Sequence, residues 1–158
     1  MKKIIIVLVA LLWVTPVLQA GWLDEVNAIH AEIKVLRDNT EGLTDDQRLE
    51  RYYTLSYDLT MLESPAFATY KGDPRGQDRL NDVSLEGIER RRRADRESLA
   101  FIESIDRESL SAAQRVNYDL LKDNLERRVN AQRFPSHYMQ MTQMSGPQQG
   151  LARLLAMM

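Results

Sequence analysis

The sequence predicts an all-α protein, a set of helical hairpins or an irregular helical bundle behind an amino-terminal signal peptide. Apolar residues recur at spacings of three and four along several segments, which is the period of an amphipathic helix. Ser and Thr residues that can cap a helix precede these segments, and Gly and Pro interrupt them. The β-type alternation of apolar and polar residues is absent before residue 135. A chain of 158 residues is long enough for one domain with a modest core.

Residues 1–20 have the layout of a secretory signal peptide, with a basic start, the apolar run from Ile4 to Val14 and a small residue at Ala20. We expect cleavage after Ala20, a periplasmic or secreted protein, and no stable membrane span afterwards. An uncleaved membrane anchor is the alternative. The apolar run is short for that purpose, because a bilayer span needs about 20 residues.

The net charge and the lack of cysteine limit the partners and the kinds of site that this protein can have. Loss of residues 1–20 removes Lys2 and Lys3, and 21 less two leaves 19 basic against 23 acidic side chains, a formal charge of −4. This balance does not predict a nucleic acid partner. The absence of Cys excludes disulfides, thiolate metal sites and thiol catalysis. Export without cysteine favours a bacterial periplasmic protein.

Two helices are predicted in the first half of the chain. The first covers residues 22–37, and the second follows Thr44, whose partner Gln47 completes a capping box. The expected buried face of the first helix consists of Leu23, Val26, Ile29, Ile33 and Leu36. The expected buried face of the second consists of Leu49, Tyr52, Tyr53, Leu59 and Leu62.

Two further helices complete a helical domain over residues 21–134. Ser84 is the expected cap of a helix with Leu85, Ile88, Leu99, Ile102 and Ile105 on its apolar face. Ser111, followed by Gln114, is the expected cap of a helix with Val116, Leu120, Leu121, Leu125 and Val129 on its apolar face. The link between these helices is short, which predicts an antiparallel hairpin.

Residues 135–158 read as a Met-rich loop and the start of a further, truncated segment. They hold five of the seven Met residues and end in an apolar run over 151–158, which is marginal as a helix alone. We expect a truncated reading frame. The alternative is a natural short protein with an amphipathic tail. The sequence assigns no substrate and no oligomeric state.

The sequence assigns no catalytic, cofactor-binding or metal-binding residue. His30 and His137 are the only histidines, and the zinc pattern His-Glu-x-x-His does not occur. His30 lies next to an apolar helix face and is expected to be partly buried or at the surface. His137 follows Pro135 in a loop and is expected to face water, with contact to a ligand as the alternative.

Clusters of charge are interpreted as solvated. Arg90–Arg93 point about 100° apart on a helix and can pair with acids at helical spacing, so they form no basic face. The acids nearby are Glu86, Glu89, Asp95 and Glu97. Asp45 with Asp46, and Asp73, Asp78 and Asp82, are expected to be turn acids and helix caps rather than a general acid–base pair.

Residues 63–84 are predicted to form a structured crossover between helices. Phe67 and Tyr70 should anchor the end of a helix in the core, and Leu80 and Val83 should return the chain to it. Charges of alternating sign can hydrogen-bond one another and stiffen the loop. They are Asp73, Arg75, Asp78, Arg79 and Asp82. Such a loop either braces two helices or forms the wall of a pocket.

Several motifs in this order resemble the amino-terminal part of a bacterial family catalogued as domain of unknown function 885. The first is a Pro-x-x-Ala-Thr-x-x-Gly run at Pro65, Ala68, Thr69 and Gly72. The second is Asp78, Arg79, Leu80, Asp82 and Ser84, and the third is Leu110, Ser111, Arg115 and Tyr118. The sequence "QMSGPQ" over 143–148 also fits. The resemblance spans about residues 22–158.

The resemblance implies an exported, mostly helical zinc metallopeptidase-like protein of the thermolysin-type superfamily. Zinc and a peptide substrate are implied for the full-length family, whose His-Glu-x-x-His motif lies beyond the part present here. No residue of this chain therefore inherits a catalytic or metal-binding role, and its status as an enzyme stays open. The sequence predicts an amino-terminal scaffold fragment that is inactive alone. The alternative is a self-sufficient periplasmic helical binding module that uses the Met-rich tail.

Overall fold

The computed structural model describes residues 21–39, 41–138, 141, 146, 149–150 and 152–153. Over these residues the chain is helical and contains no strand, which confirms the all-α prediction. The helices are α2 (Trp22–Asp38), α3 (Asp45–Glu63), α4 (Pro65–Lys71), α5 (Leu85–Glu103) and α6 (Ala112–Ala131), with 3₁₀ turns η1 (Arg107–Ser109) and η2 (Ser136–Tyr138). The predicted signal peptide over 1–20 and most of the Met-rich segment lie outside the described residues.

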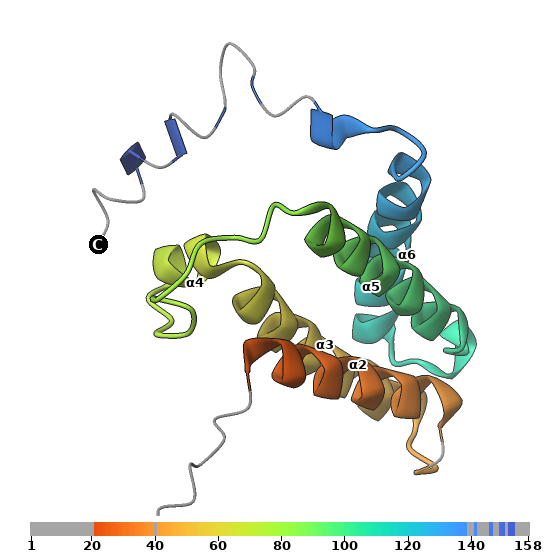
Figure 1. The fold of residues 1–158 in the computed structure, drawn as a ribbon. Helices are drawn as coiled ribbons and strands as arrows, with labels where there is room; N and C mark the ends of the chain where they lie inside the picture. Colours follow the sequence, from red (N-terminus) through yellow and green to blue (C-terminus); the bar gives the residue numbers. More distant parts are fainter. Residues whose placement is uncertain are drawn as a thin grey trace, which may run out of the picture.

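The helices form two pairs that pack on each other (Figure 1). Helix α2 lies along α3, and α5 and α6 form the predicted antiparallel hairpin through η1. Helix α2 also packs on α5, whereas α3 and α6 meet over only a short stretch. The crossover between α4 and α5 passes along the end of the bundle opposite to η1 (Figure 1). The bundle is therefore closed along α2 and α5 and open between α3 and α6.

The predicted caps are confirmed at two helices. Thr44 Oγ1 accepts from the Gln47 amide at 3.3 Å, and Gln47 Oε1 accepts from the Thr44 amide at 3.1 Å, which completes the capping box. Ser84 Oγ accepts from the Gly87 amide at 3.0 Å. Ser111 occupies the cap position of α6, but its side chain forms no cap hydrogen bond.

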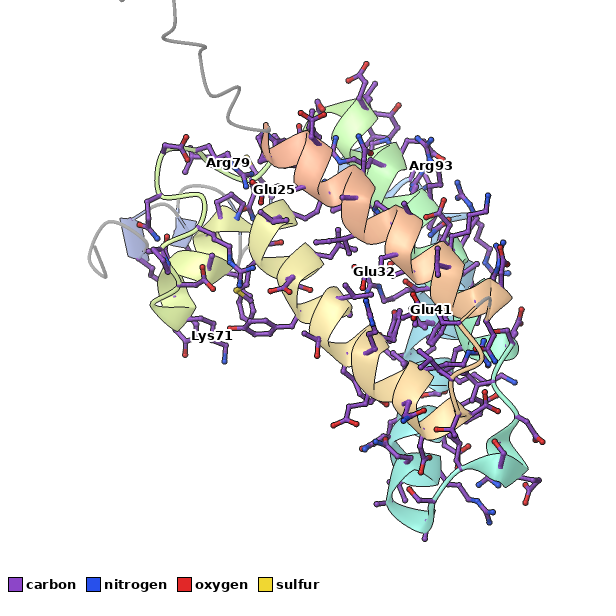
Figure 2. All side chains as sticks on the ribbon, turned by 90° about the horizontal axis from the view of Figure 1, so that it is seen from below. Glu25, Glu32, Glu41, Lys71, Arg79 and Arg93 are labelled. Atoms are coloured by element: carbon purple, nitrogen blue, oxygen red, sulfur yellow. The ribbon has the colours of Figure 1, made fainter. Side chains whose placement is uncertain are left out.

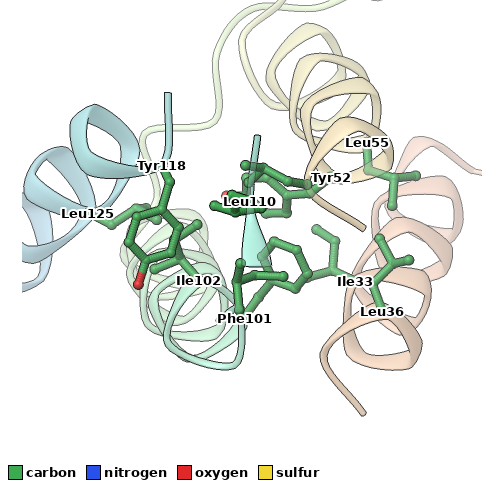
Figure 3. Packing of buried hydrophobic residues seen from close by; sticks show 11 residues of the cluster. Ile33, Leu36, Tyr52, Leu55, Phe101, Ile102, Leu110, Tyr118 and Leu125 are labelled. Carbon is green, nitrogen blue, oxygen red and sulfur yellow. The ribbon is translucent and has the colours of Figure 1, made fainter. Parts of the chain in front are cut away.

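The core lies between α2, α3 and α5, with α6 covering one side (Figure 3). The Phe101 and Tyr52 rings stack with centroids 4.6 Å apart, and Ile102 and Leu49 are fully buried beside them. Burial of such side chains contributes about 1.5–3 kcal/mol each relative to exposure. The cluster consists of Ile33, Leu36, Leu49, Tyr52, Leu55, Phe101, Ile102, Ile105, Leu110, Tyr118 and Leu125.

Some of the predicted core positions are exposed. Leu23, Leu85, Val116 and Leu120 carry apolar side chains on the predicted faces, yet all four lie at the surface. Helix α6 packs chiefly on α5, so only a narrow stripe of it is covered, and Tyr118 takes part in that stripe. Periodicity identifies an apolar face but not the portion of that face that a neighbour covers.

A buried arginine closes the η1 end of the bundle. Arg48 is only 4% exposed and donates to the carbonyl oxygens of Leu36 (2.8 Å), Arg37 (3.0 Å) and Ser104 (3.2 Å). It also donates to Ser104 Oγ at 2.6 Å and Asp45 Oδ1 at 2.6 Å. These carbonyl groups lie at the carboxyl ends of α2 and α5, where helices leave acceptors unpaired. We call these five residues the Arg48 cluster.

Asp45 and Asp46 stand in the first turn of α3, but they are half-buried rather than solvated turn acids. Asp45 Oδ2 accepts from Ser109 Oγ at 2.8 Å and from the Asp106 amide at 3.0 Å, and Asp46 Oδ1 accepts from the Ser111 amide at 3.1 Å. Burial opposes ionisation of Asp45, but its hydrogen bonds outweigh burial and lower the pKa of its carboxyl. The pair ties α3 to the link between α5 and α6.

Candidate functional site

The crossover holds its apolar side chains outward. Phe67 and Tyr70 are exposed and stack on each other at the surface, with ring centroids 6.4 Å apart. Leu80 and Val83 are 62% and 68% exposed. The prediction that these four residues anchor the crossover in the core is wrong. Charged side chains of the crossover take the inner positions instead.

Arg75 and Arg79 are two of these inward-facing charged residues, and both contact α3. Arg75 donates to both oxygens of Asp73, at 2.9 and 2.7 Å, and to Asp58 Oδ1 on α3 at 2.7 Å. The side chain and amide of Arg75 lower the pKa of Asp73 to about 2. Arg79 donates to the carbonyl oxygen of Leu62 at 2.7 Å. The predicted pairing within the loop is therefore confirmed for Asp73 with Arg75, while other partners lie on α3.

The centre of the crossover end is a second arginine, Arg90, which is partly buried. Arg90 Nε donates to Glu63 Oε1 at 2.6 Å, and Arg90 Nη2 donates to Glu63 Oε2 at 3.1 Å and to Asp82 Oδ2 at 3.0 Å. The Trp22 ring lies against two guanidinium groups, with Cζ of Arg79 4.2 Å and Cζ of Arg90 5.0 Å from its centroid. Figure 2 labels Arg79 beside the start of α2. We call these five residues the Arg90 cluster.

The Arg90 cluster corrects the prediction that Arg90–Arg93 form a solvated run. The Arg90 side chain is 17% exposed and pairs with acids 27 and 8 positions away, not with acids at helical spacing. Only Arg92 keeps the predicted helical pair, with Glu89 at 4.0 Å. No local pattern in the sequence links Glu63 to Arg90, because their contact depends on how α3 and α5 pack.

The position of Asp82 explains why a residue without a side chain, Gly87, occurs near the start of α5. The hydroxyl and amide of Ser84 and the guanidinium of Arg90 lower the pKa of Asp82 to about 2. A Cβ atom at position 87 would lie 2.4 Å from Asp82 Oδ2. Gly87 therefore leaves room for the carboxylate that joins the crossover to Arg90.

A polar cavity adjoins the Arg90 cluster between α3, α5 and α6. It has a volume of about 220 Å³ and is lined by Glu63, by Ser56 and Thr60 of α3, and by Arg91 and Asp95 of α5, among others. Asp95 pairs with Arg128 of α6. Burial raises the pKa of Asp95, because it outweighs the attraction of Arg128. This cavity is the candidate functional site, since it brings two largely buried carboxylates, Glu63 and Asp95, and more exposed arginines to an opening in the bundle.

The histidines lie elsewhere. His30 of α2 is partly buried, as predicted, with Nδ1 3.1 Å from Glu97 Oε2. His137 lies half-buried in η2 beside Tyr138, 4.3 Å between ring centroids, rather than in an open loop. In the part of the chain that the structure describes, no three His, Asp or Glu side chains gather in a way that could hold a metal ion. The residues described here therefore do not fit the zinc site that the resemblance implies.

A comparison with known protein families matches the second half of the chain to one family. A family described as "Bacterial protein of unknown function (DUF885)" matches residues 65–158, from the start of α4 onward. The match includes the crossover, α5 and α6. No curated protein and no solved structure matches the chain. Within the described ranges, no helix has both the length and the apolar character needed to cross a bilayer.

Proposed function

Because the chain belongs to the bacterial family of unknown function DUF885, we propose that residues 21–138 are the helical scaffold of an exported, zinc metallopeptidase-like protein. In this proposal the zinc motif and the peptide-cleaving chemistry lie outside this chain, and the chain alone is inactive. The observation that carries the proposal is the family match over residues 65–158, which begins at α4 and contains the whole crossover.

The build of the crossover supports a scaffold role. Its inner face is fixed by ion pairs to α3 and α5, and its apolar side chains at Leu80 and Val83 face outward. Exposed apolar side chains beside a rigid backbone are typical of a surface that packs on another part of a protein. A scaffold that carries such a surface would position a neighbouring segment without taking part in its chemistry.

The first test is the metal content and activity of the purified chain. We expect substoichiometric zinc after dialysis against trace zinc, and no hydrolysis of a mixed peptide library. A stoichiometric zinc ion, together with hydrolysis that His30→Gln or His137→Gln abolishes, would show that the chain is itself the enzyme.

The second test addresses the natural protein and its location. Antibodies against residues 21–138 should detect, in the source bacterium, an exported polypeptide larger than the 18.3 kDa of this chain. Its first residue should be Gly21, and its continuation should carry His-Glu-x-x-His. A periplasmic product with the mass of residues 21–158 and no zinc motif would instead favour the self-sufficient binding module.

A further inference from the structure

The opening between α3 and α6 is longer than the polar cavity alone. A second, more open cavity of about 520 Å³ is lined by Tyr53 of α3 and by Asn117, Leu120, Leu121 and Asn124 of α6. Leu121 lines both cavities, so they lie next to each other at this residue. From Tyr53 to Glu63 the α3 wall rises about 15 Å. We call these two neighbouring cavities together the α3/α6 groove.

The half of the groove near η1 is apolar with one unsatisfied hydroxyl. Leu120 is 66% exposed although it belongs to an apolar stripe, and Leu121 beside it is half-buried. The hydroxyl oxygen of Tyr53 is buried and has no hydrogen-bond partner among the described residues. Burial raises the pKa of Tyr53, so its hydroxyl keeps its proton and can donate. Buried polar atoms without a partner are rare in folded proteins, and an acceptor on a ligand would satisfy this one.

The half of the groove near the crossover contains a guanidinium group with spare donors. Arg91 Nη1 lies 3.6 Å from Glu63 Oε2, too far for a hydrogen bond, because Arg90 already holds that carboxylate. The Arg91 side chain is 34% exposed and lines the groove. Arg128 is paired with Asp95 in the same cavity. Arg91 is therefore the charged group that can donate hydrogen bonds to a ligand. Because its guanidinium group is positive, we expect that ligand to carry an anionic group.

We propose that the α3/α6 groove binds a short extended peptide segment that presents a carboxylate to Arg91 and an apolar side chain to Leu120 and Leu121, with a backbone carbonyl accepting from Tyr53. An extended chain rises about 3.3 Å per residue, so roughly five residues span the groove. The carboxylate is either the carboxyl terminus of the bound peptide or an acidic side chain of that peptide.

This site goes beyond the scaffold role and does not depend on it. Binding by the groove requires neither zinc nor hydrolysis. If the purified chain proved to hold zinc, the scaffold proposal would fail while the peptide titrations below could still succeed. Failure of the titrations would leave the metal measurements unaffected.

The test is calorimetric titration of the chain with three pentapeptides and one lipid-like probe. The peptides are acetyl-Leu-Ala-Leu-Ala-Leu as the free acid, the same peptide as its amide, and the amide with Glu as its last residue. Dodecanoate is the probe for an apolar acid without a backbone. We expect the free acid or the Glu peptide to bind at least about tenfold more tightly than the Leu amide, since a charge-assisted hydrogen bond is lost. The tighter of the two acids identifies the source of the carboxylate.

The variants separate the groove from general charge effects. Arg91→Gln should weaken binding of the acid about tenfold and leave binding of the amide unchanged. Tyr53→Phe should weaken both peptides a few-fold. Arg93→Gln removes the same charge from α5 on the face toward α2, where Figure 2 labels Arg93, and should bind as the parent does. Circular dichroism melting checks that each variant folds, and Arg91→Lys provides a second substitution that retains the charge.

Three outcomes would overturn the proposal. The acid and the amide would bind equally well, or no peptide would bind, or Arg91→Gln would bind the acid as tightly as the parent does. Binding of dodecanoate alone, with the same dependence on Arg91, would assign the groove to apolar acids rather than peptides.

Discussion

Each end of the bundle is built around one arginine, the buried Arg48 at one end and the partly buried Arg90 at the other, and the partners of the two arginines differ. In the Arg48 cluster the guanidinium donates to three main-chain carbonyl groups, at the carboxyl ends of α2 and α5, as well as to Asp45. In the Arg90 cluster the guanidinium donates only to the carboxylates of Glu63 and Asp82. Hydrogen bonds to main-chain carbonyl groups hold the helix backbone itself in position. Hydrogen bonds to carboxylates hold a helix only through a side chain, and a carboxylate can become protonated.

This difference separates a structural end from an adaptable end. The Arg48 end joins α2, α3 and α5 through main-chain carbonyl groups beside the core. The Arg90 end holds a crossover with exposed apolar side chains and adjoins the α3/α6 groove. We therefore expect disruption at the Arg48 end to unfold the whole domain, and disruption at the Arg90 end to affect mainly the crossover.

The largest effect is expected for Arg48→Met. This change removes the Arg48 donors from Asp45 Oδ1 and from three carbonyl groups at buried and partly buried positions, which should lower the free energy of unfolding by about 3–5 kcal/mol. Urea denaturation followed by circular dichroism measures it. Arg51→Met, on the same helix and largely exposed, should leave the midpoint unchanged. Equal effects of the two substitutions would contradict the role given to Arg48.

A smaller effect is expected for Arg90→Met. The loss of charge-assisted hydrogen bonds to Glu63 and Asp82 should cost about 1–3 kcal/mol. Arg91 remains 3.6 Å from Glu63, and Ser84 still donates to Asp82, so the acids keep some compensation. The matched control is Arg93→Met in the same urea titration. A cost above that of Arg48→Met would reverse the comparison of the two ends.

Gly87→Ala tests the crossover end by sterics. In a helix this change normally stabilises by about 0.5–1 kcal/mol. Here the new methyl group would displace the Asp82 carboxylate from Arg90, so we expect destabilisation of roughly 1 kcal/mol. In the Asp82→Ala background the clash is absent and the substitution should stabilise. The same sign in both backgrounds would show that Asp82 does not occupy that position.

Acid should loosen the Arg90 cluster before it unfolds the helices. The pKa of Asp82 is lowered from 3.8 to about 2, so its contribution to stability is complete above pH 3.8 and is lost as the pH falls toward about 2. Trp22 is the single tryptophan after Ala20, and its fluorescence reports on this cluster. We expect its emission to change at a higher pH than the helical signal. Coincident acid transitions would argue against a separate crossover end.

The smallest effect is expected for Leu80→Ser and Val83→Ser. Both side chains are exposed, so each change should alter the free energy of unfolding by less than about 0.5 kcal/mol in a urea titration. A loss of several kcal/mol would place these residues in the core, as their sequence pattern predicts. Solubility that rises without a change in stability would fit a surface that normally packs on another segment.

The sequence predicts the helices well because their signals are local. The capping box at Thr44, the break at Gly72 and the short link before Ser111 each define a boundary by residues within a few positions. The antiparallel packing of α5 and α6 follows from the length of that link. These features need no knowledge of how distant segments meet.

The candidate site could not be predicted, because its contacts join distant segments. Glu63 and Arg90 are 27 positions apart, and Arg128 reaches Asp95 from another helix. From the sequence, Asp95 is expected to be a surface acid among arginines. In the structure α6 packs against it. Leu80 and Val83 read as core residues, since an apolar side chain carries no sign of whether a neighbour within this chain will cover it.

Amide hydrogen exchange of Arg90→Met, measured beside the parent chain, tests the central comparison most directly. Loss of protection should be confined to the amides of Asp73, Ser84 and Gly87, which are bonded at the crossover end, while α3 and the second half of α5 keep theirs. Faster exchange spread evenly over all helices, or no change at the crossover, would show that the two arginine clusters do not divide the domain into a structural end and an adaptable end.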